Sequence, residues 1–531
     1  MYTAEMLASI LKVEEQRSAN MAANLKRLTA EEKEKLLSGF HPDYKTEEFN
    51  ILRVGPNKGD RVPIELAEQL ESHSRIRDVS INLNDTDYDV DVLVIGGGGA
   101  ASSAAIEAHE AGADVMIVTK LRIGDANTMM AEGGVQAATK DNDSLTQHYL
   151  DSFGGGHYAA VPQLLKKLIK EGPGAIKWLI ELGVMFDKEP DGTLITTSGG
   201  GVSRNRVHAC ADYTGAEIMR TLRDEVFNRE IPVIEFTAAV ELILDEDGKA
   251  AGAVLLNMET GQHMVAKAKT VIIATGGAGR LHYQGFPTSN HYGATADGLV
   301  LAYRAGVELI YAEAFQYHPT GAAYPTQIFG CLVTEKVRAL GARLINIHGE
   351  AFINPLETRD VTASGIIREC SERGNGITTP QGQAVWLDSP QIEILRGKGT
   401  IEKSIPAMLR MFMKYDIDMR EKPILVYPTL HYQNGGIKVN LDCSTVISNL
   451  FVAGEAVGGI HGRNRLLGNS MLDIIVFGRS AGKNAAQMCK SVKLAKPTLA
   501  HIDKYSKEMK SAGIETENES PLLLPKYART F

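Results

Sequence analysis

The chain has 531 residues, of which 44% are hydrophobic and 23% charged, so it is long enough for two or three ordinary domains with sizeable cores. Its formal net charge of −9 and the lack of a long Lys/Arg run argue against a nucleic-acid binder, because neutralising phosphates requires a basic surface. We therefore expect no nucleic-acid partner.

The cysteines and the apolar segments limit the compartment and the metal chemistry. The five cysteines are far apart and odd in number, which predicts buried thiols rather than a disulfide framework or a metal site. The N-terminus carries acidic residues early and does not fit a signal peptide, and no segment approaches the roughly 18 apolar residues of a membrane helix. We expect a cytoplasmic protein, whose association with a membrane complex would be peripheral.

Residues 1–85 are charged and have a helical period. The residues of the first apolar stripe are Met6, Leu7, Ile10, Leu11 and Val13. A helical N-terminal extension follows from this pattern. Two interpretations of its role stay open, an arm that covers the surface of the following domain and a docking element for a partner subunit.

From residue 91 the pattern changes to a buried strand (DVLVI), a glycine-rich turn, an alanine-rich helix from about Ala100 and a second strand that ends near Thr119. This order is a βαβ unit. Later strands are TVIIAT, which leads into Gly276, and NLFVAGE, which leads into a helix from about Asn469 to Gly482. Proline and glycine punctuate residues 321–430, which indicates an inserted second domain.

The turn after the first strand, from Gly96 to Ala101, fits the pattern G-x-G-x-x-[GA]. Such a turn lets a pyrophosphate approach the backbone at a helix N-terminus. Alone the motif is weak, and a turn that is merely rich in glycine is the alternative. Thr119 and Lys120 stand where an acidic residue usually binds the ribose of NAD, which argues against a simple NAD enzyme.

The segment TKLRIGDANTMMAEGGVQAA, which begins at Thr119, strongly resembles the flavin-binding segment of succinate dehydrogenase and fumarate reductase flavoproteins. The resemblance continues through ATGGAGR, QYHPTG, TEKVRALGA, TRD, HYQNGG and AGEAVGGIHGRNRLLGNSML, in that order, and covers residues 88–490. It implies an α/β fold in which a Rossmann-like FAD-binding domain is interrupted by an α+β capping domain. The expected segments are 1–85 (extension), 86–320 and 431–490 (FAD-binding domain), 321–430 (capping domain) and 491–531 (C-terminal tail).

The resemblance also implies the residues that bind FAD. Glu455 would bind a ribose hydroxyl, and the helix that begins at Asn469 would stabilise the anionic reduced flavin with its dipole. The full implied set is Gly96, Gly98, Ala101, Thr119, Lys120, Asn127, Thr128, Ala131, Gly133, Gly134, Asp297, Glu455, Asn469, Ser470 and Leu472. Asn127 occupies the place of the histidine that attaches FAD covalently in respiratory members, so we expect noncovalent FAD and a preference for substrate reduction.

Seven residues of the C-terminal half match a dicarboxylate site in the same family. The resemblance makes His431 and Arg465 one carboxylate clamp, and His318 with Thr334 the other. It makes Arg359 the proton donor, and two further residues, Glu335 and Arg338, would resupply its proton. Taken singly, each histidine could be structural, and Arg359 could form a structural ion pair with Asp360.

The expected reaction is the reduction of fumarate to succinate. The chain contains no cysteine cluster and no C-x-x-C-H motif, so an iron–sulfur subunit or another separate donor must supply the electrons. The alternatives are a reductase of another unsaturated carboxylate, an L-aspartate oxidase and an electron-transfer flavoprotein subunit of a larger complex. Gly199 to Ser203 contain no acid that could meet a substrate ammonium, which disfavours the oxidase.

Overall fold

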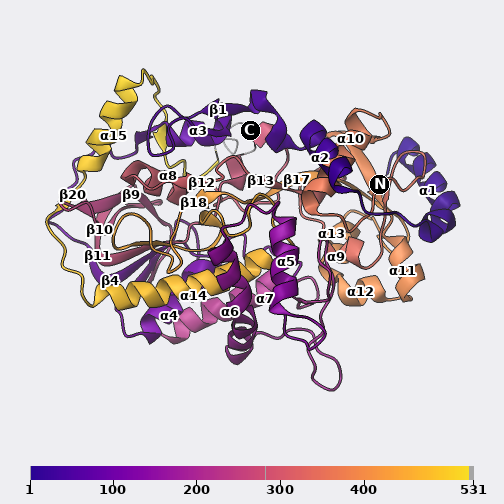
Figure 1. Ribbon diagram of the computed structural model, residues 1–531, viewed down its shortest axis with the longest axis horizontal. Coiled ribbons are helices and arrows are strands. Elements are labelled where there is room, and N and C mark those ends of the chain that lie inside the picture. The colour runs from indigo at the N-terminus through magenta and orange to yellow at the C-terminus, as the bar shows by residue number, and fades with distance from the viewer. Residues whose placement is uncertain (1, 282, 526–531) are drawn as a thin grey trace.

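The computed structural model describes residues 2–281 and 283–525, which form a mixed α/β structure (Figure 1). Two bodies lie next to each other in Figure 1. The larger body, on the left, contains the large sheet and is formed mainly by residues 86–320 and 431–490. The smaller body, on the right, is formed by residues 321–430 together with helices of the N-terminal extension.

An eight-stranded sheet organises the larger body, with the order β20-β9-β10-β11-β4-β5-β8 and with β19 beside β11. The pairs β11–β4, β4–β5, β5–β8 and β11–β19 are parallel, and β9, β10, β11 and β20 form antiparallel pairs. Apolar runs form the central strands because both faces of the sheet are covered. The strands are β4 (Tyr88–Ile95), β5 (Val115–Val118), β8 (Val233–Ile234), β9 (Thr237–Asp245), β10 (Ala250–Asn257), β11 (His263–Ile273), β19 (Leu450–Val452) and β20 (Pro497–Thr498).

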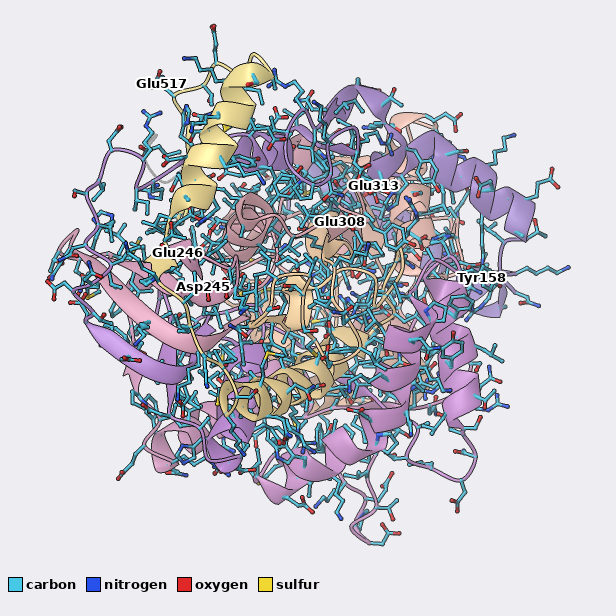
Figure 2. All side chains as sticks on the ribbon, turned by 60° about the vertical axis from the view of Figure 1, so that its left-hand side comes forward. Tyr158, Asp245, Glu246, Glu308, Glu313 and Glu517 are labelled. Carbon is cyan, nitrogen blue, oxygen red and sulfur yellow. The ribbon has the colours of Figure 1, made fainter. Side chains whose placement is uncertain are left out.

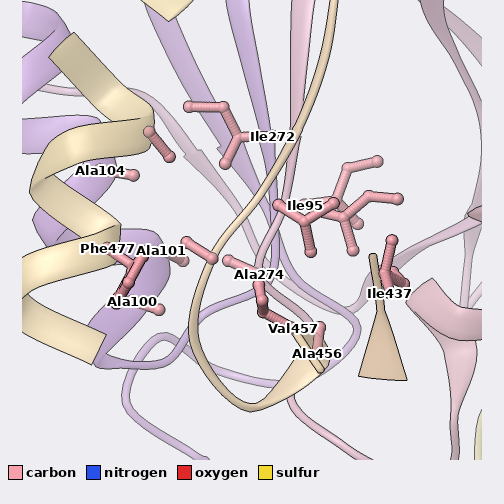
Figure 3. Close-up of a cluster of buried hydrophobic side chains, with 14 of the residues drawn as sticks. Ile95, Ala100, Ala101, Ala104, Ile272, Ala274, Ile437, Ala456, Val457 and Phe477 are labelled. Carbon is pink, nitrogen blue, oxygen red and sulfur yellow. The ribbon is translucent and has the colours of Figure 1, made fainter. Parts of the chain in front are cut away.

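Small residues bring two helices of the larger body close together. A Cβ added to Gly478 on α14 would lie 2.7 Å from the carbonyl oxygen of Ala100 on α4, so the two backbones almost touch. Figure 3 shows Ala100, Ala101 and Ala104 beside Phe477 in this contact. The helices of this body are α4 (Gly99–Glu110), α5 (Leu145–Gly155), α6 (Pro162–Glu181), α7 (Thr214–Asn228), α8 (Asp297–Ala305) and α14 (Asn469–Cys489), the last being longer than expected from the sequence.

The smaller body has its own five-stranded sheet, β13-β17-β16-β14 with β15 beside β16, and its own apolar core. Two strands pass from one core to the other. On β13, Tyr317 packs in the core of the larger body and Ala322 in that of the smaller body, and on β17, Val426 packs in the core of the smaller body and Leu430 in that of the larger body. The domain boundaries that we propose, after residues 320 and 430, lie at these changes. The elements are β13 (Phe315–Ala322), α9 (Lys336–Ala339), β14 (Leu344–Ile345), α10 (Arg359–Ser371), β15 (Ile377–Thr379), β16 (Gly382–Leu387), α11 (Pro390–Arg396), α12 (Thr400–Ser404), α13 (Pro406–Met413) and β17 (Ile424–Gln433).

The N-terminal extension packs its first two helices into the core of the smaller body. Met6, Ile10 and Val13 are buried there, whereas Leu7 and Leu11 of the same predicted stripe are 40% and 59% exposed. This packing favours the interpretation of the extension as a covering arm. Its elements are α1 (Ala4–Ala22), α2 (Ala30–Phe40), the 3-10 turns η1 (Pro42–Tyr44) and η2 (Thr46–Glu48), β1 (Phe49–Ile51), β2 (Arg61–Pro63), α3 (Ile64–Leu70) and β3 (His73–Ser74).

The C-terminal tail returns to the larger body, where β21 pairs with β3 of the extension. Within the described ranges, no helix is long and apolar enough to cross a membrane, and no group of three or more His, Cys, Asp or Glu side chains is placed to hold a metal ion. The remaining elements are β6 (Val135–Gln136), β7 (Val207–His208), η3 (Gly279–Leu281), η4 (Tyr283–Gly285), β12 (Leu309–Ile310), η5 (Thr326–Ile328), β18 (Gly436–Ile437), η6 (Gly454–Ala456), α15 (Ala500–Ser511) and β21 (Glu519–Ser520).

Candidate active site

A cavity of about 870 Å³ begins at the glycine turn after β4 and extends to arginine side chains from both bodies. Most of the residues that the sequence singles out line this one cavity. They are Gly96, Gly98, Thr119, Lys120, Asn127, Thr128, Ala131, Gly133, Gly134, Asp297, His318, Thr334, Glu335, Arg359, His431, Glu455, Arg465 and Ser470.

The glycine turn forms one end of the cavity with bare backbone. Gly96 has a φ of +131°, and a Cβ at this position would lie 2.2 Å from the carbonyl oxygen of Ala274. A Cβ on Gly97 would lie 2.6 Å from Oγ1 of Thr119. Helix α4 begins directly after the turn, so its free N–H groups point toward this end of the cavity, where a pyrophosphate fits.

Next to the glycine turn, Lys120 is bound on several sides. Its Nζ lies 2.5 Å from Oδ2 of Asp297, 2.7 Å from Oγ1 of Thr295 and 2.7 Å from the carbonyl oxygen of Leu523. The carboxylate of Asp297 therefore balances the charge of Lys120. The contact with Leu523 brings the C-terminal tail to this end of the cavity.

The side chain of Asn127 is held by three hydrogen bonds. Its Nδ2 donates to Oδ1 of Asn290 at 2.8 Å and to Oε2 of Glu455 at 3.1 Å, and its Oδ1 accepts from the backbone N–H of His291 at 2.7 Å. Glu455 also accepts from the N–H of Gln433, while its burial raises the pKa of its carboxyl. A neutral amide thus stands at this point of the cavity wall, and it offers no nucleophile for a covalent bond.

Two neighbouring strands, β13 and β17, place two histidines at the other end of the cavity. The rings of His318 and His431 lie 5.1 Å apart, and Oγ of Ser289 lies 2.8 Å from Nδ1 of His431. Burial, and then the charge of Arg359, lower the pKa of both imidazoles well below the usual value, so both are neutral. Nδ1 of His318 lies 3.2 Å from the backbone nitrogen and 3.3 Å from the carbonyl oxygen of Thr320, so Nδ1 is used by this backbone.

Glu335 binds two arginines at the boundary of the two bodies. Its Oε2 accepts from Nε of Arg359 at 2.8 Å and lies 3.4 Å from a terminal nitrogen of Arg338. Burial would raise the pKa of Glu335, but Arg359, Arg338 and the N–H of Gly200 outweigh burial and lower it. Burial also lowers the pKa of Arg338 to about 10, which makes its proton easier to move.

Gln316 joins two of the arginines that line the cavity, Arg359 and Arg465. Its Oε1 accepts from Arg359 at 2.9 Å and from Arg465 at 3.0 Å, and its Nε2 donates to Oδ1 of Asn464 and to the carbonyl oxygen of Arg465. Sequence reasoning missed this residue. The signal was present, because residues two apart on a strand share a face, and Gln316 precedes His318 by two positions.

Arg465 comes from the loop before α14 and is buried. It donates to Oγ of Ser470 at 2.9 Å, and its guanidinium lies 4.3 Å from the centre of the Tyr432 ring. Burial, followed by the charge of Arg359, lowers its pKa to about 9, so it stays protonated at neutral pH. In the described part of the chain its Nε has no hydrogen-bond partner, and Nε2 of His318 has none either.

Four of the predicted residues lie behind the cavity wall rather than on it. Ala101 and Leu472 are fully buried in α4 and α14. Arg338 is buried behind Glu335, and the side chain of Asn469 bonds to His148 and Ser152 at the start of α14. Their roles toward a ligand would therefore be indirect.

The comparisons with known proteins agree with this cavity. Residues 91–471 match the family of the FAD binding domain. An uncharacterised FAD-dependent oxidoreductase of Methanocaldococcus jannaschii is 40% identical over 405 residues, which are 74% of this chain and 71% of that protein. One of the subunits of the fumarate reductase (CoM/CoB) of Methanothermobacter marburgensis is 38% identical and covers 74% of this chain and 72% of its own length.

This chain belongs to the family of fumarate reductase and succinate dehydrogenase flavoproteins. A solved structure of a variant of the E. coli quinol fumarate reductase protein FrdA superimposes with a TM-score of 0.73 at 30% identity, over 80% of this chain and 74% of that chain. An L-aspartate oxidase of Streptomyces coelicolor is 34% identical over 71% of this chain and 64% of its own length. The protein is thus an FAD-dependent oxidoreductase, and the glycine turn and cavity described above fit FAD.

Proposed function

We propose that this flavoprotein reduces fumarate to succinate, with electrons from a separate donor. The observation that carries the proposal is the charge at the end of the cavity. Two buried guanidiniums, from Arg338 and Arg359, contact the carboxylate of Glu335, and a third, from Arg465, shares the oxygen of Gln316 with Arg359, beside two neutral histidines. The cluster has two positive charges in excess, and a dicarboxylate dianion would balance them.

The two proposed clamps divide the dianion between them. Nε of Arg465 has no partner in the part of the chain that the structure describes, and its planar guanidinium suits a carboxylate. His431, on β17, lines the same cavity. Nε2 of His318 has no partner among the described residues, and Thr334 lines the same cavity, so these two would bind the second carboxylate as neutral donors with the imidazole proton on Nε2. Because burial keeps both histidines neutral, binding does not depend on their protonation at neutral pH.

Arg359 is the proposed proton donor. Bound FAD would supply the hydride for one alkene carbon, and a proton must reach the other carbon. Arg359 keeps a strong hydrogen bond to Glu335, and Arg338 lies on the far side of the same carboxylate. A proton lost from Arg359 can therefore be replaced through Glu335, so that no neutral arginine accumulates.

We propose that FAD is held without a covalent bond, because Asn127 is a hydrogen-bonded amide in the cavity wall. Acid precipitation of the purified protein should release all of the flavin into the supernatant. Yellow colour that stays with the pellet would contradict this proposal. The presence of Asn127 in the place of the family's FAD-attaching histidine also predicts that dye-driven fumarate reduction is faster than succinate oxidation under matched conditions.

Aspartate oxidation is the second candidate, since one relative has that name. An amino acid substrate needs an acid to meet its ammonium group. In this chain the loop of Gly199 and Gly200 contains no acid, and the carboxylate beside it, Glu335, is already bound to two arginines. Fumarate therefore suits the charges of the site better than aspartate. A reductase of another unsaturated acid would be expected to lack one of the two clamps.

The electron donor is proposed to be a separate protein, such as an iron–sulfur subunit. Relatives of this chain are named as flavoprotein subunits of fumarate reductases, and the five cysteines of this chain are widely spaced. One proposed arrangement is that the flavoprotein and its electron donor associate peripherally with a membrane complex.

The test of the proposed activity is the anaerobic oxidation of a reduced viologen dye by the purified protein. Fumarate, a monocarboxylic enoate, an aryl enoate and, in the reverse direction, L-aspartate and succinate should be compared. We expect the highest kcat/KM with fumarate. A higher value with a monocarboxylate would overturn the two-clamp arrangement, and oxidation of L-aspartate alone would establish the second candidate.

A further inference from the structure

Three segments that are distant in sequence meet beside the first turn of α10. The loop after α5 in the larger body contributes His157, α10 of the smaller body contributes Asp360, and the residue directly after α2 in the N-terminal extension contributes His41. Nε2 of His157 lies 2.5 Å from Oδ2 of Asp360. Asp360 is buried and directly follows Arg359, the proposed proton donor.

The backbone at His157 is strained. His157 and Tyr158 have φ values of +59° and +58°, a region that side chains other than glycine seldom occupy. Tyr158, labelled in Figure 2, lies at the surface with 74% of its area exposed, so burial of that ring does not cause the strain. The strained turn instead directs the imidazole of His157 inward to Asp360.

The same loop is bound to the segment that carries Arg465. The carbonyl oxygen of Gly156 accepts from the N–H of Arg463 at 3.1 Å, and the carbonyl oxygen of Gly155 accepts from Nδ2 of Asn464 at 2.9 Å. The loop therefore touches one arginine-bearing segment through its backbone and the other through His157. No other described ion pair joins the loop to α10.

We propose that His157 is a positioning residue that holds Arg359 of the smaller body in register with Arg465 of the larger body. When the imidazolium is paired with Asp360, the first turn of α10 is fixed against the loop of Arg465, and both guanidiniums reach the shared oxygen of Gln316. When His157 loses its proton, the attraction between the two charges is lost and the first turn of α10 is held less firmly against the loop. This inference rests on the proposed function, because it gives a role to the residue next to Arg359.

The charges around His157 favour its protonated form. The hydrogen bond to Asp360 raises the pKa of His157 more than burial lowers it, Glu34 on α2 adds to the rise, and Arg463 opposes it. Burial lowers the pKa of the third group, His41, to about 4, so it is neutral in the working range. Glu313 forms an ion pair with Arg463 at 2.6 Å, which weakens the effect of Arg463 on the pKa of His157.

The sign of the pH effect follows from the raised pKa. The pair contributes fully below the ordinary histidine pKa of about 6.5, and its contribution disappears as the pH rises through the raised value. The other member of the pair, Asp360, must also be charged in this pH range. Burial would raise its pKa, but His157 outweighs burial and lowers it, so Asp360 stays ionised throughout this range.

The first experiment compares wild type with His157→Gln, an uncharged variant that retains a hydrogen-bond donor, in dye-driven fumarate reduction between about pH 6 and pH 9.5. The ratio of the two kcat/KM values should be about tenfold at the acid end, the size expected for a charge-assisted hydrogen bond, and should approach one at the alkaline end. Because both proteins are measured at each pH, the effects of titrating the substrate and other shared groups cancel in this ratio. A merely structural role predicts a ratio that does not change with pH.

A second variant keeps the charge. His157→Lys should hold the pair at alkaline pH, so its kcat/KM should not fall in the range where wild type loses activity. His109→Gln is the matched control, because His109 is exposed at the end of α4 in the larger body. Its profile should follow that of wild type at every pH.

The third measurement does not depend on turnover. In protein with ring-labelled histidine, the NMR signal that disappears in His157→Gln should titrate above pH 6.5, and it should move down by about one pH unit or more in Asp360→Asn. An ordinary pKa for this signal, or a kcat/KM ratio that does not change with pH, overturns the proposal. Failure of the proposed function would appear differently, as no fumarate turnover in wild type while the histidine signal still shows the raised pKa.

Discussion

The two ends of the cavity are built by different means. At the glycine turn, a few consecutive residues provide backbone N–H groups, and the important property is the lack of side chains at Gly96 and Gly97. At the arginine end, charged side chains from distant parts of the sequence meet across the boundary of two cores, with Glu335 and Arg359 from one body and Arg465 from the other.

This difference predicts how each end responds to change. A backbone site tolerates no added atoms but needs few specific side chains, since its donors belong to the main chain. A side-chain site depends on each partner, because a buried charge whose partner is removed has no water to replace it. The first end should therefore fail through the loss of the cofactor, and the second through the loss of turnover with the cofactor retained.

Gly96→Ala should have the largest effect. The added Cβ would lie 2.2 Å from a backbone oxygen, at a φ of +131°, so the turn must move. We expect the purified protein to retain less than about a tenth of the wild-type FAD, measured as the flavin-to-protein absorbance ratio. Gly112→Ala is the control, because Gly112 also has a positive φ, of +83°, but a Cβ added there would meet no neighbouring atom within 4 Å, and this variant should keep its FAD.

Arg359→Lys should reduce kcat by about 10³-fold, because a lysine lacks the reach and the planar fork that connect to Glu335. FAD content should not change, and succinate should still perturb the flavin spectrum. Arg465→Lys is the comparison, and it should weaken the binding of dicarboxylates as well as turnover. Fumarate turnover near the wild-type level in Arg359→Lys would remove the proton donor from the proposed mechanism.

Gln316→Leu should lower kcat/KM for fumarate by about 10- to 100-fold, since two buried guanidiniums lose their shared acceptor. FAD content should again be normal. Tyr317→Phe, the next residue on β13, is a suitable control because its side chain packs in the apolar core of the larger body. Equal effects of the two substitutions would indicate general damage to the strand instead of a specific bond.

Ile10→Ala should have the smallest effect on activity and a measurable effect on stability. Ile10 is buried in the core of the smaller body, so the free energy of unfolding should fall by about 2–4 kcal/mol. Leu11→Ala removes a similar side chain that is 59% exposed, and thermal denaturation should detect little change. Similar destabilisation by both variants would mean that α1 does not bury the face that contains Ile10.

The sequence predicted the glycine end well because its information is local. The run from Gly96 to Ala101 follows an apolar strand and precedes a helix, and all of these features are visible in a short window. The family membership and FAD were likewise predicted and are confirmed by the comparisons. The roles of the individual arginines and histidines stay predictions.

The residues that the sequence did not reveal depend on long-range contacts. Gln316 matters because Arg359 and Arg465 meet at its oxygen, and the partners are 43 and 149 residues away. His157 and Asp360 are 203 residues apart, and no period or motif connects them. The apolar stripe of the N-terminal arm was visible, but its target was not, because amphipathicity indicates that a face is buried without naming the surface that buries it.

The arm also has a consequence for biosynthesis. Oγ of Ser9 accepts a hydrogen bond from Nε1 of Trp386, 377 residues later, and the hydroxyl of Tyr2 donates to the carbonyl oxygen of Pro423. At about 5–20 residues per second, a ribosome needs roughly 20–80 s to reach Trp386 after it has made Ser9. During that interval the two hydrogen bonds to Trp386 and Pro423 cannot form, although earlier partners such as Tyr324 are already made. Helix α1 is therefore made long before these two partners, and a chaperone that binds nascent chains would find a site on this protein at residues 4–22.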